Sequence, residues 1–379
     1  MAVETMSIAT APAAIPRSRR ESQFGLMWRR FRRHKLAVVS LWVAGLFYLV
    51  ALLAEFLAPV EPSAYSARFT YAPPQGLHFL HHSEDGSWQF GPYVYGYKTE
   101  IDPVALRRTF VIDEAVRLPV SFLVESEPYR LMGFIPTSVK LMGVENPRDP
   151  FYILGADRLG RDMLSRLIHG TRISLSIGVA GVTLSLFFGI VIGGFAGYYG
   201  GWFDSAVMRV IEFIRSMPTI PLWLGLAAAM PKDWTALQTY FAITIILSLI
   251  GWTELARVVR GRFLSLRTED FVTAAQLDGA SDWRIITRHM VPSFMSHIIA
   301  AATLAIPGMI LAETALSFLG LGLQAPIVSW GTLLQDAQNI RTLATAPWLL
   351  APGLCVVVVI LAMNFFGDGL RDAADPHGR

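Results

Sequence analysis

Few side chains in this sequence have the types and spacing that catalysis or metal binding requires. The chain has one cysteine, Cys355, inside the apolar run 349–366, which argues against a disulfide, redox chemistry or a thiolate metal site. A second set of potential ligands combines histidines with acidic residues: His78, His81, His82, Glu84 and Asp85. Their spacing matches no standard zinc pattern, so we expect no metal site and no catalytic residue.

Nucleotide hydrolysis is also not encoded by any familiar motif. The four lysines follow His34, Tyr97, Val139 and Pro231, so there is no Gly-Lys-Ser/Thr phosphate loop. Neither His-Glu-x-x-His nor Gly-x-Ser-x-Gly occurs, which removes the obvious zinc-protease and serine-hydrolase interpretations. The sequence predicts a protein that is not an enzyme and has no cofactor in this chain.

The composition instead points to a protein whose solvent is lipid. Hydrophobic residues make up 53% of the 379 residues and charged residues only 16%, with a mean hydropathy of +0.45. A soluble chain this apolar could not cover its own surface, and a disordered, collagenous or disulfide-rich protein is excluded as well.

Apolar runs bounded by charged residues predict the membrane spans. Five runs approach or exceed the roughly 20 residues that a spanning helix needs: 36–54, 173–203, 234–253, 289–312 and 342–367. A sixth, 217–230, is short and carries Pro218 and Pro221, but it reaches spanning length if its helix begins near Asp204. We expect an all-α membrane protein with six transmembrane helices.

The distribution of charge predicts the orientation. The first 35 residues carry eight basic residues against two acidic ones, which places them in the cytoplasm as part of an uncleaved anchor. Six arginines between positions 257 and 288 fall on the side that alternation of the spans also makes cytoplasmic. The predicted parts are a cytoplasmic N-terminus (1–35), a first transmembrane helix (36–58), a periplasmic segment (59–171), a five-helix core (172–367) with a cytoplasmic coupling loop (257–292), and a cytoplasmic C-terminus (368–379).

The segment 59–171 is too long for an ordinary connection between helices. Residues 59–150 carry eleven acidic against eight basic residues, which fits an outward-facing segment. The stretch 88–97 is rich in aromatic residues, glycine and proline, and predicts strand and turn. We expect a small β-containing subdomain that either docks a partner or covers the membrane surface.

Small residues recur every four positions along the second span: Gly181, Ser185, Gly189, Gly193, Gly197 and Gly201. A face of this kind lets a second helix approach closely, because packing rather than hydrophobicity drives association in lipid. We expect Gly189, Gly193 and Gly197 to contact a tightly packed helix, in this chain or in another.

The arginine-rich loop after the fourth span predicts two short helices across a bend. Thr268 can cap the first, Gly279 can supply the left-handed residue that ends it, and Ser281 can cap the second. Ala274 and Ala275 give the first helix a shallow side that the groove of another protein could accept. An amphipathic loop resting on the membrane surface is the alternative interpretation.

This loop resembles a known segment. Ala274-Ala275, three further residues, Gly279, and then His289 to Pro292 resemble the EAA loop of bacterial ABC-importer permeases, which docks on the ATP-binding subunit. Further stretches are similar to the oligopeptide and dipeptide importer permeases in particular: 154–166 with 170–175, 197–204, and 313–322 with 329–331. The resemblance covers about residues 25–57 and 150–376.

The resemblance implies a multi-pass permease subunit in the bacterial inner membrane that forms half of an ATP-driven import path for peptides or peptide-like solutes. It implies a second, different permease subunit that forms a heterodimer with this chain, and ATP-binding cassette subunits that bind ATP and Mg. It also implies a periplasmic or extracellular solute-binding protein, surrounding membrane lipid, and no nucleic acid. The implied coupling residues are Thr273, Ala274, Ala275, Asp278 and Gly279. Thr273 stands where the family has Glu, and the outer segment has a length closer to importers of the microcin C type.

Other solutes and another protein class remain open from the sequence. Oligosaccharides, nickel chelates and opine-like conjugates are alternative substrates within the same resemblance. An ion-coupled transporter or channel is the rival class, and Glu313 in the fifth span is the residue that could relay protons. The position of Glu313 near the outer end of that span favours an interfacial or helix-packing role. An ion-coupled transporter or channel would also not need a docking loop.

Overall fold

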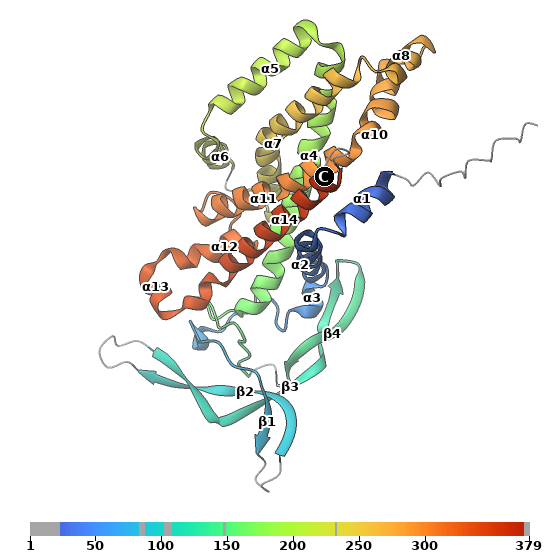
Figure 1. Ribbon diagram of the computed structural model, residues 1–379. Coiled ribbons are helices and arrows are strands. Elements are labelled where there is room, and N and C mark those ends of the chain that lie inside the picture. The colour runs from blue at the N-terminus through green and yellow to red at the C-terminus, as the bar shows by residue number, and fades with distance from the viewer. Residues whose placement is uncertain (1–22, 83–87, 102–107, 147–148, 232, 375–379) are drawn as a thin grey trace, which may run out of the picture.

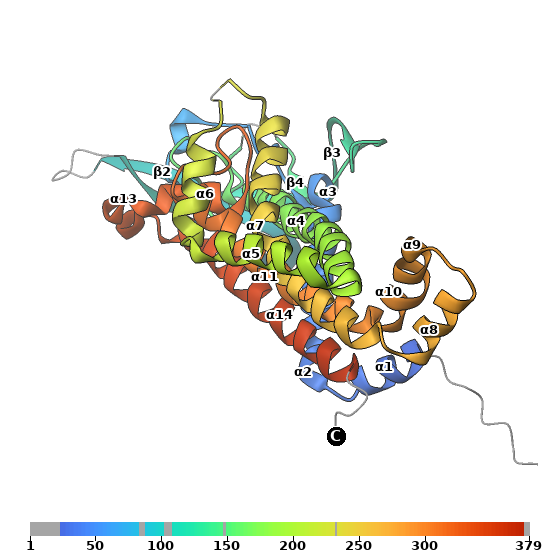
Figure 2. The ribbon, with the colours of Figure 1, turned by 90° about the horizontal axis from the view of Figure 1, so that it is seen from above.

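The computed structural model describes residues 23–82, 88–101, 108–146, 149–231 and 233–374, and consists of a helical bundle with a β-sheet at one end (Figure 1). The helices are α1 (Gln23–Phe31), α2 (Lys35–Leu52), α3 (Ala54–Leu57), α4 (Met163–Tyr199), α5 (Gly201–Ser216), α6 (Thr219–Ala228), α7 (Ala236–Leu266), α8 (Asp270–Leu277), α9 (Asp282–Arg284), α10 (Val291–Ser293), α11 (Met295–Phe318), α12 (Trp330–Leu334), α13 (Ile340–Thr345) and α14 (Ala351–Ala374). Seen from above, α7 and α11 lie close to the central helix α4 (Figure 2).

Within the described residues, five helices are long and apolar enough to cross a membrane: α2, α4, α7, α11, and α14 with its preceding turn. A sixth candidate is the pair α5 and α6, which is bent by 85°. The bend falls at Met217-Pro218, where Pro218 lacks the N–H that would continue a helix. A mostly helical architecture with five to six candidate membrane helices is thus confirmed, and the predicted third span corresponds to the bent pair.

Two spans are longer than the charge boundaries predict. Helix α4 begins at Met163, ten residues before the predicted start. Helix α7 continues to Leu266, because Val259 and Phe263 are buried while Arg257 and Arg262 on the opposite side are exposed. A charged residue ends an apolar run, but an amphipathic helix continues through it.

The described residues of the outer segment form four strands between positions 78 and 144, as the expected β-containing subdomain requires, so the all-α class holds for the membrane helices and not for this part. Strands β1 (His78–His82), β2 (Trp88–Ile101), β3 (Arg108–Leu131) and β4 (Ile135–Val144) form an antiparallel sheet in the order β1-β2-β3-β4. The predicted strand at 88–97 lies in β2. The 24-residue strand β3 pairs with β2 through its first half and with β4 through its second, which joins two hairpins into one subdomain.

Candidate functional site

The coupling loop turns at Gly279, as its sequence predicts. Gly279 has a φ of +73°, a conformation that residues with a Cβ rarely adopt. Its N–H donates to the Gln276 carbonyl, and the Ala280 N–H donates to the Ala275 carbonyl, both at 3.0 Å. These two bonds form a Schellman motif that ends α8 in a defined direction.

The helix that follows starts at Ser281, whose hydroxyl accepts from the Arg284 N–H at 3.4 Å, so this predicted cap is confirmed. Helix α9 then passes through a π-helical turn, Ile285–Met290, into α10. The predicted cap at Thr268 is wrong. Glu269 is the N-cap residue of α8, because the Thr268 hydroxyl donates to the Ser265 carbonyl at 3.3 Å and thus belongs to the end of α7.

One side of the coupling loop belongs to the core of this chain. Val272 and Ala275 of α8 are buried in a cluster with Val259 and Phe263 of α7. Ala275 therefore faces inward, whereas Ala274 is exposed. The two alanines do not share the shallow outer side that their sequence suggests, because a step of one residue turns a side chain by about 100° around a helix.

The other side of the loop presents apolar groups to the exterior. Leu277 is 84% exposed, and Trp283 and Phe271 are 57% and 40% exposed. Thr273 and Asp278 are exposed on the same helix and its C-cap. An apolar group with a polar rim on a well-packed loop is typical of a protein interaction site.

Two tyrosines at the end of α4 hold the loop in place. The Tyr198 and Tyr199 hydroxyls donate to the two carboxylate oxygens of Asp282 at 2.9 and 2.7 Å. The Gln276 amide donates to the Tyr198 hydroxyl at 3.2 Å, and Trp283 stacks on Phe195 of α4 with ring centroids 6.1 Å apart. Tyr198 and Tyr199 lie in the stretch 197–204, but no local sequence pattern indicates that they bind Asp282.

The small-residue stripe of α4 lies against α7 of the same chain. A Cβ added at Gly189 would lie 2.8 Å from the Leu255 Cβ, and one at Gly193 would lie 2.8 Å from the Ala256 Cα. At Gly197 it would lie 2.6 Å from the Phe263 Cβ. Helices α4 and α7 therefore touch at backbone distance from Leu255 to Phe263, where the coupling loop begins.

Helix α5 is joined to the same unit by charge. The Arg260 guanidinium of α7 donates to both carboxylate oxygens of Asp204 in the first turn of α5. Both side chains are largely screened from solvent, which favours a paired arrangement over separate ions. Helices α4, α5 and α7 and the coupling loop are thus linked at one end of the bundle.

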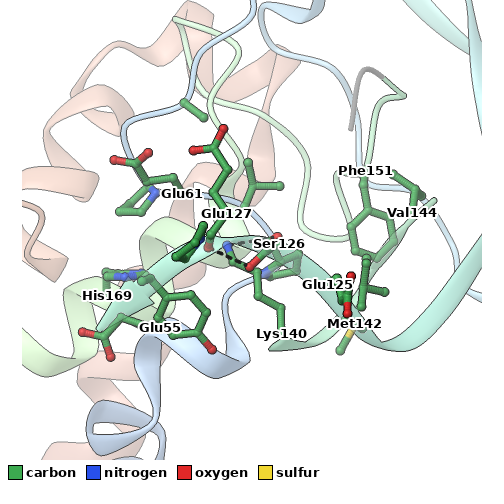
Figure 3. Close-up of a pocket in the computed structure, with 18 of the residues that line it drawn as sticks. Glu55, Glu61, Glu125, Ser126, Glu127, Lys140, Met142, Val144, Phe151 and His169 are labelled. Atoms are coloured by element: carbon green, nitrogen blue, oxygen red, sulfur yellow. Dashed lines mark hydrogen bonds between the residues drawn. The ribbon is translucent and has the colours of Figure 1, made fainter. Parts of the chain in front are cut away.

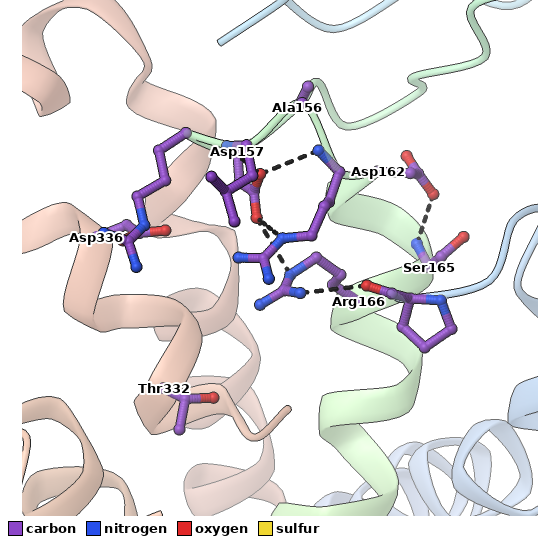
Figure 4. A network of polar contacts seen from close by, with 12 residues as sticks. Ala156, Asp157, Asp162, Ser165, Arg166, Thr332 and Asp336 are labelled. Atoms are coloured by element: carbon purple, nitrogen blue, oxygen red, sulfur yellow. Dashed lines mark hydrogen bonds and ion pairs between the residues drawn. The ribbon is translucent and has the colours of Figure 1, made fainter. Parts of the chain in front are cut away.

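The opposite end of α4 is fixed by a buried carboxylate (Figure 4). Asp157 accepts from the Arg161 Nε at 2.6 Å and pairs with the Arg166 Nε at 3.4 Å. Asp162 caps α4 by accepting from the Ser165 N–H at 2.7 Å, and burial raises the pKa of Asp162 to about 6. This network explains the polar composition of the stretch 154–166.

Glu313 lies fully buried between helices. The Ser174 hydroxyl of α4 and the Ser317 hydroxyl donate to its two carboxylate oxygens at 3.2 and 2.8 Å. The Trp330 N–H at the start of α12 donates to the same Ser174 hydroxyl at 3.1 Å. These contacts support the helix-packing role of Glu313 and connect α4, α11 and α12.

A pocket of about 660 Å³ lies between the outer sheet and the outer ends of α3 and α4 (Figure 3). Glu61, Glu125 and Glu127 give its lining an acidic character. Lys140 also lines the pocket and donates to the Pro59 carbonyl at 3.3 Å, and burial lowers the pKa of this lysine. The pocket thus lies beside the contact of β3 and β4 with α3, and Lys140 links β4 to the connection that follows α3.

The described ranges contain no group of three His, Cys, Asp or Glu side chains placed to hold a metal ion. His78 stacks on Tyr93 with ring centroids 5.4 Å apart. Of the other candidate ligands, Glu84 and Asp85 lie outside the described residues. Cys355 is half-buried in α14.

Two family models match the chain. Residues 189–379 match "binding-protein-dependent transport system inner membrane component", and residues 22–74 match "N-terminal TM domain of oligopeptide transport permease C". These matches cover α1 to α3, the end of α4, and everything from α5 to α14 with the coupling loop, and they leave out the outer sheet and the first two-thirds of α4.

Curated relatives agree with these models. The oligopeptide transport system permease protein OppC of Haemophilus influenzae is 38% identical over 244 residues, which is 64% of this chain and 76% of the relative. OppC of Escherichia coli K12 is 41% identical over 229 residues (60% and 73%). The dipeptide transport system permease protein DppC of Alkalihalophilus pseudofirmus is 39% identical over 224 residues (59% and 71%). The chain therefore belongs to the binding-protein-dependent transport system inner membrane components, in the family of ABC importer permeases that includes the OppC and DppC proteins.

Proposed function

We propose that this chain forms half of the translocation path of an ATP-driven importer for peptides or peptide-like solutes in the bacterial inner membrane. Its relatives carry names of oligopeptide and dipeptide transport permeases. A second permease subunit supplies the other half of the path, a solute-binding protein delivers the solute, and separate subunits bind ATP and Mg. Six spans, with α5 and α6 as the third, leave both termini in the cytoplasm and the sheet outside it.

The observation that carries the proposal is the two-sided coupling loop. Its outer side exposes Leu277 and Trp283, which suits the groove of an ATPase subunit. Its inner side is held to α4 and α7 by the cluster around Phe263 and by the Asp282–tyrosine bonds. When ATP binding closes the ATPase subunits, the loop is displaced and moves the helices packed against it as rigid bodies. This motion opens the translocation path alternately to the two sides of the membrane.

Gly279→Val tests this role, because a β-branched residue strongly resists a φ of +73°. We expect the variant to insert normally, while solute-stimulated ATP hydrolysis and uptake fall together in membranes reconstituted with the ATPase and the binding protein. Gly261→Ala is the matched control, since Gly261 lies nearby in α7 with nothing within 4 Å of an added Cβ. If complexes with Gly279→Val took up solute and hydrolysed ATP at wild-type rates, this loop would be ruled out as the coupling element.

The orientation is tested by labelling single cysteines in a Cys355→Ser background. A thiol reagent that cannot cross the inner membrane should label Phe90→Cys on the sheet, where the side chain is 78% exposed. It should not label Leu277→Cys until the membrane is opened. Labelling of Leu277→Cys in sealed spheroplasts would invert the proposed topology.

A further inference from the structure

The hairpin that joins β3 to β4 ends in an apolar tip, residues 130–135. The Phe134 N–H donates to the Leu131 carbonyl at 3.3 Å. The two residues between them, Met132 and Gly133, have φ of 55° and 84°. Positive φ at both central positions is the type I′ pattern, where Asn-Gly or Gly-Gly is preferred in water. This chain places methionine there, although a side chain without a local hydrogen bond gains nothing from that conformation.

The side chains of the tip point away from any core of the described chain. Phe134 is 67% exposed, Ile135 44% and Met132 37%. Arg130 is exposed directly beside them. Contiguous exposed apolar residues beside a cation have the composition of segments that enter the boundary between lipid headgroups and acyl chains.

The tip is placed where that boundary must lie. The Met132 N–H donates to Glu55 of α3 at 3.5 Å, and both β3 and β4 pack against α3 (Figure 1). Glu55 lies three residues beyond the end of α2, or about 5 Å at the helical rise. The outward half of α2 itself exposes Leu46, Leu49 and Leu52. The apolar tip thus continues the lipid-facing surface of the first membrane span.

We propose that the tip of the β3–β4 hairpin inserts into the outer leaflet of the membrane and anchors the sheet beside α2. Met132, Phe134 and Ile135 contact the upper acyl chains, and Arg130 contacts lipid phosphate. The continuity with the exposed face of α2 favours lipid over a protein partner as the occupant. The inference requires only that α2 spans the membrane, and it is independent of the transported solute and of the ATPase.

The test is an environment-sensitive fluorophore on Phe134→Cys, in a Cys355→Ser background of the full chain. The chain is reconstituted in vesicles of phosphatidylethanolamine and phosphatidylglycerol. The control is the same label on Phe90→Cys, because Phe90 lies on the same sheet and is 78% exposed. We expect blue-shifted emission at position 134, quenching by lipids brominated on the upper acyl chain, and iodide quenching several-fold weaker than at position 90.

Equal iodide quenching at both positions without quenching by brominated lipid would overturn the proposal. The proposal would also be overturned if position 134 became protected from both quenchers only when a second permease subunit was added. That result would assign the tip to a protein interface. Uptake by the labelled complex reports the transport function separately, so a failure of the anchor is distinguishable from a failure of the proposed import activity.

Discussion

Replacing Gly193 with alanine should separate helices that now touch at backbone distance. The added Cβ would lie 2.8 Å from the Ala256 Cα, whereas carbon atoms pack at about 3.5–4.0 Å. The obstructing atoms belong to the backbone of α7, so no rotamer change relieves the contact. The two helices must move apart by roughly an ångström, which also loosens the neighbouring contacts at Gly189 and Gly197.

The expected cost follows from two terms of opposite sign. Gly→Ala in a helix interior gains up to about 1 kcal/mol in helix propensity. Overpacking costs about 1–3 kcal/mol, and more where backbones meet. Gly45→Ala in α2 receives the first term alone, because nothing lies within 4 Å of its added Cβ. The difference between the two variants therefore isolates the overpacking cost.

The assay is the unfolding of the full-length chain in mixed micelles, followed by its tryptophan fluorescence. We expect Gly45→Ala to unfold at or slightly above the wild-type denaturant midpoint and Gly193→Ala clearly below it. Gly193→Leu should also abolish transport. Equal midpoints for the two alanine variants would refute the close approach of α4 and α7.

Two further predictions concern polar contacts. The double variant Tyr198→Phe, Tyr199→Phe removes both hydrogen bonds from α4 to Asp282. Because the outer side of the loop is unchanged, the ATPase subunit should still copurify, while solute-stimulated ATP hydrolysis falls severalfold. Unchanged stimulation would show that these two hydrogen bonds are not needed for coupling. Burial raises the pKa of Asp162 to about 6, so the folded state holds a proton that the unfolded state has lost. The wild type should therefore lose stability relative to Asp162→Asn as pH rises from about 4 to 6. Unfolding midpoints of the two proteins that change in parallel across this range would contradict the raised pKa of Asp162.

The sequence predicts the local features of the coupling loop well. Gly279 and Ser281 act within four residues of their own positions, and turns and caps depend on such short-range bonds. The spans are likewise marked by apolar runs of sufficient length. The N-cap of α8 was predicted one residue too early, because the end of α7 and the start of α8 are separated by only three residues. Thr268 lies between them and its hydroxyl binds the Ser265 carbonyl at the end of α7.

The long-range contacts could not be read from the chain. Tyr198 and Asp282 are separated by 84 positions, and neither residue type signals its partner. The stripe around Gly193 predicts a close neighbour without saying that it is α7. The length of β3 was also not predictable, because its second half gains its strand conformation by pairing with β4 rather than from a strong alternation of apolar residues.

The central claim is that the outer side of the coupling loop docks a separate ATPase subunit, and Leu277→Asp tests it most directly. Leu277 is 84% exposed, so aspartate costs the isolated chain little, whereas a carboxylate buried in an interface costs several kcal/mol. Phe90→Asp, at a position 78% exposed on the outer sheet, is the matched control. The measurement is copurification of the ATPase subunit with each variant from membranes. We predict that the subunit is lost from Leu277→Asp and retained by Phe90→Asp; equal retention by both would contradict docking at this loop.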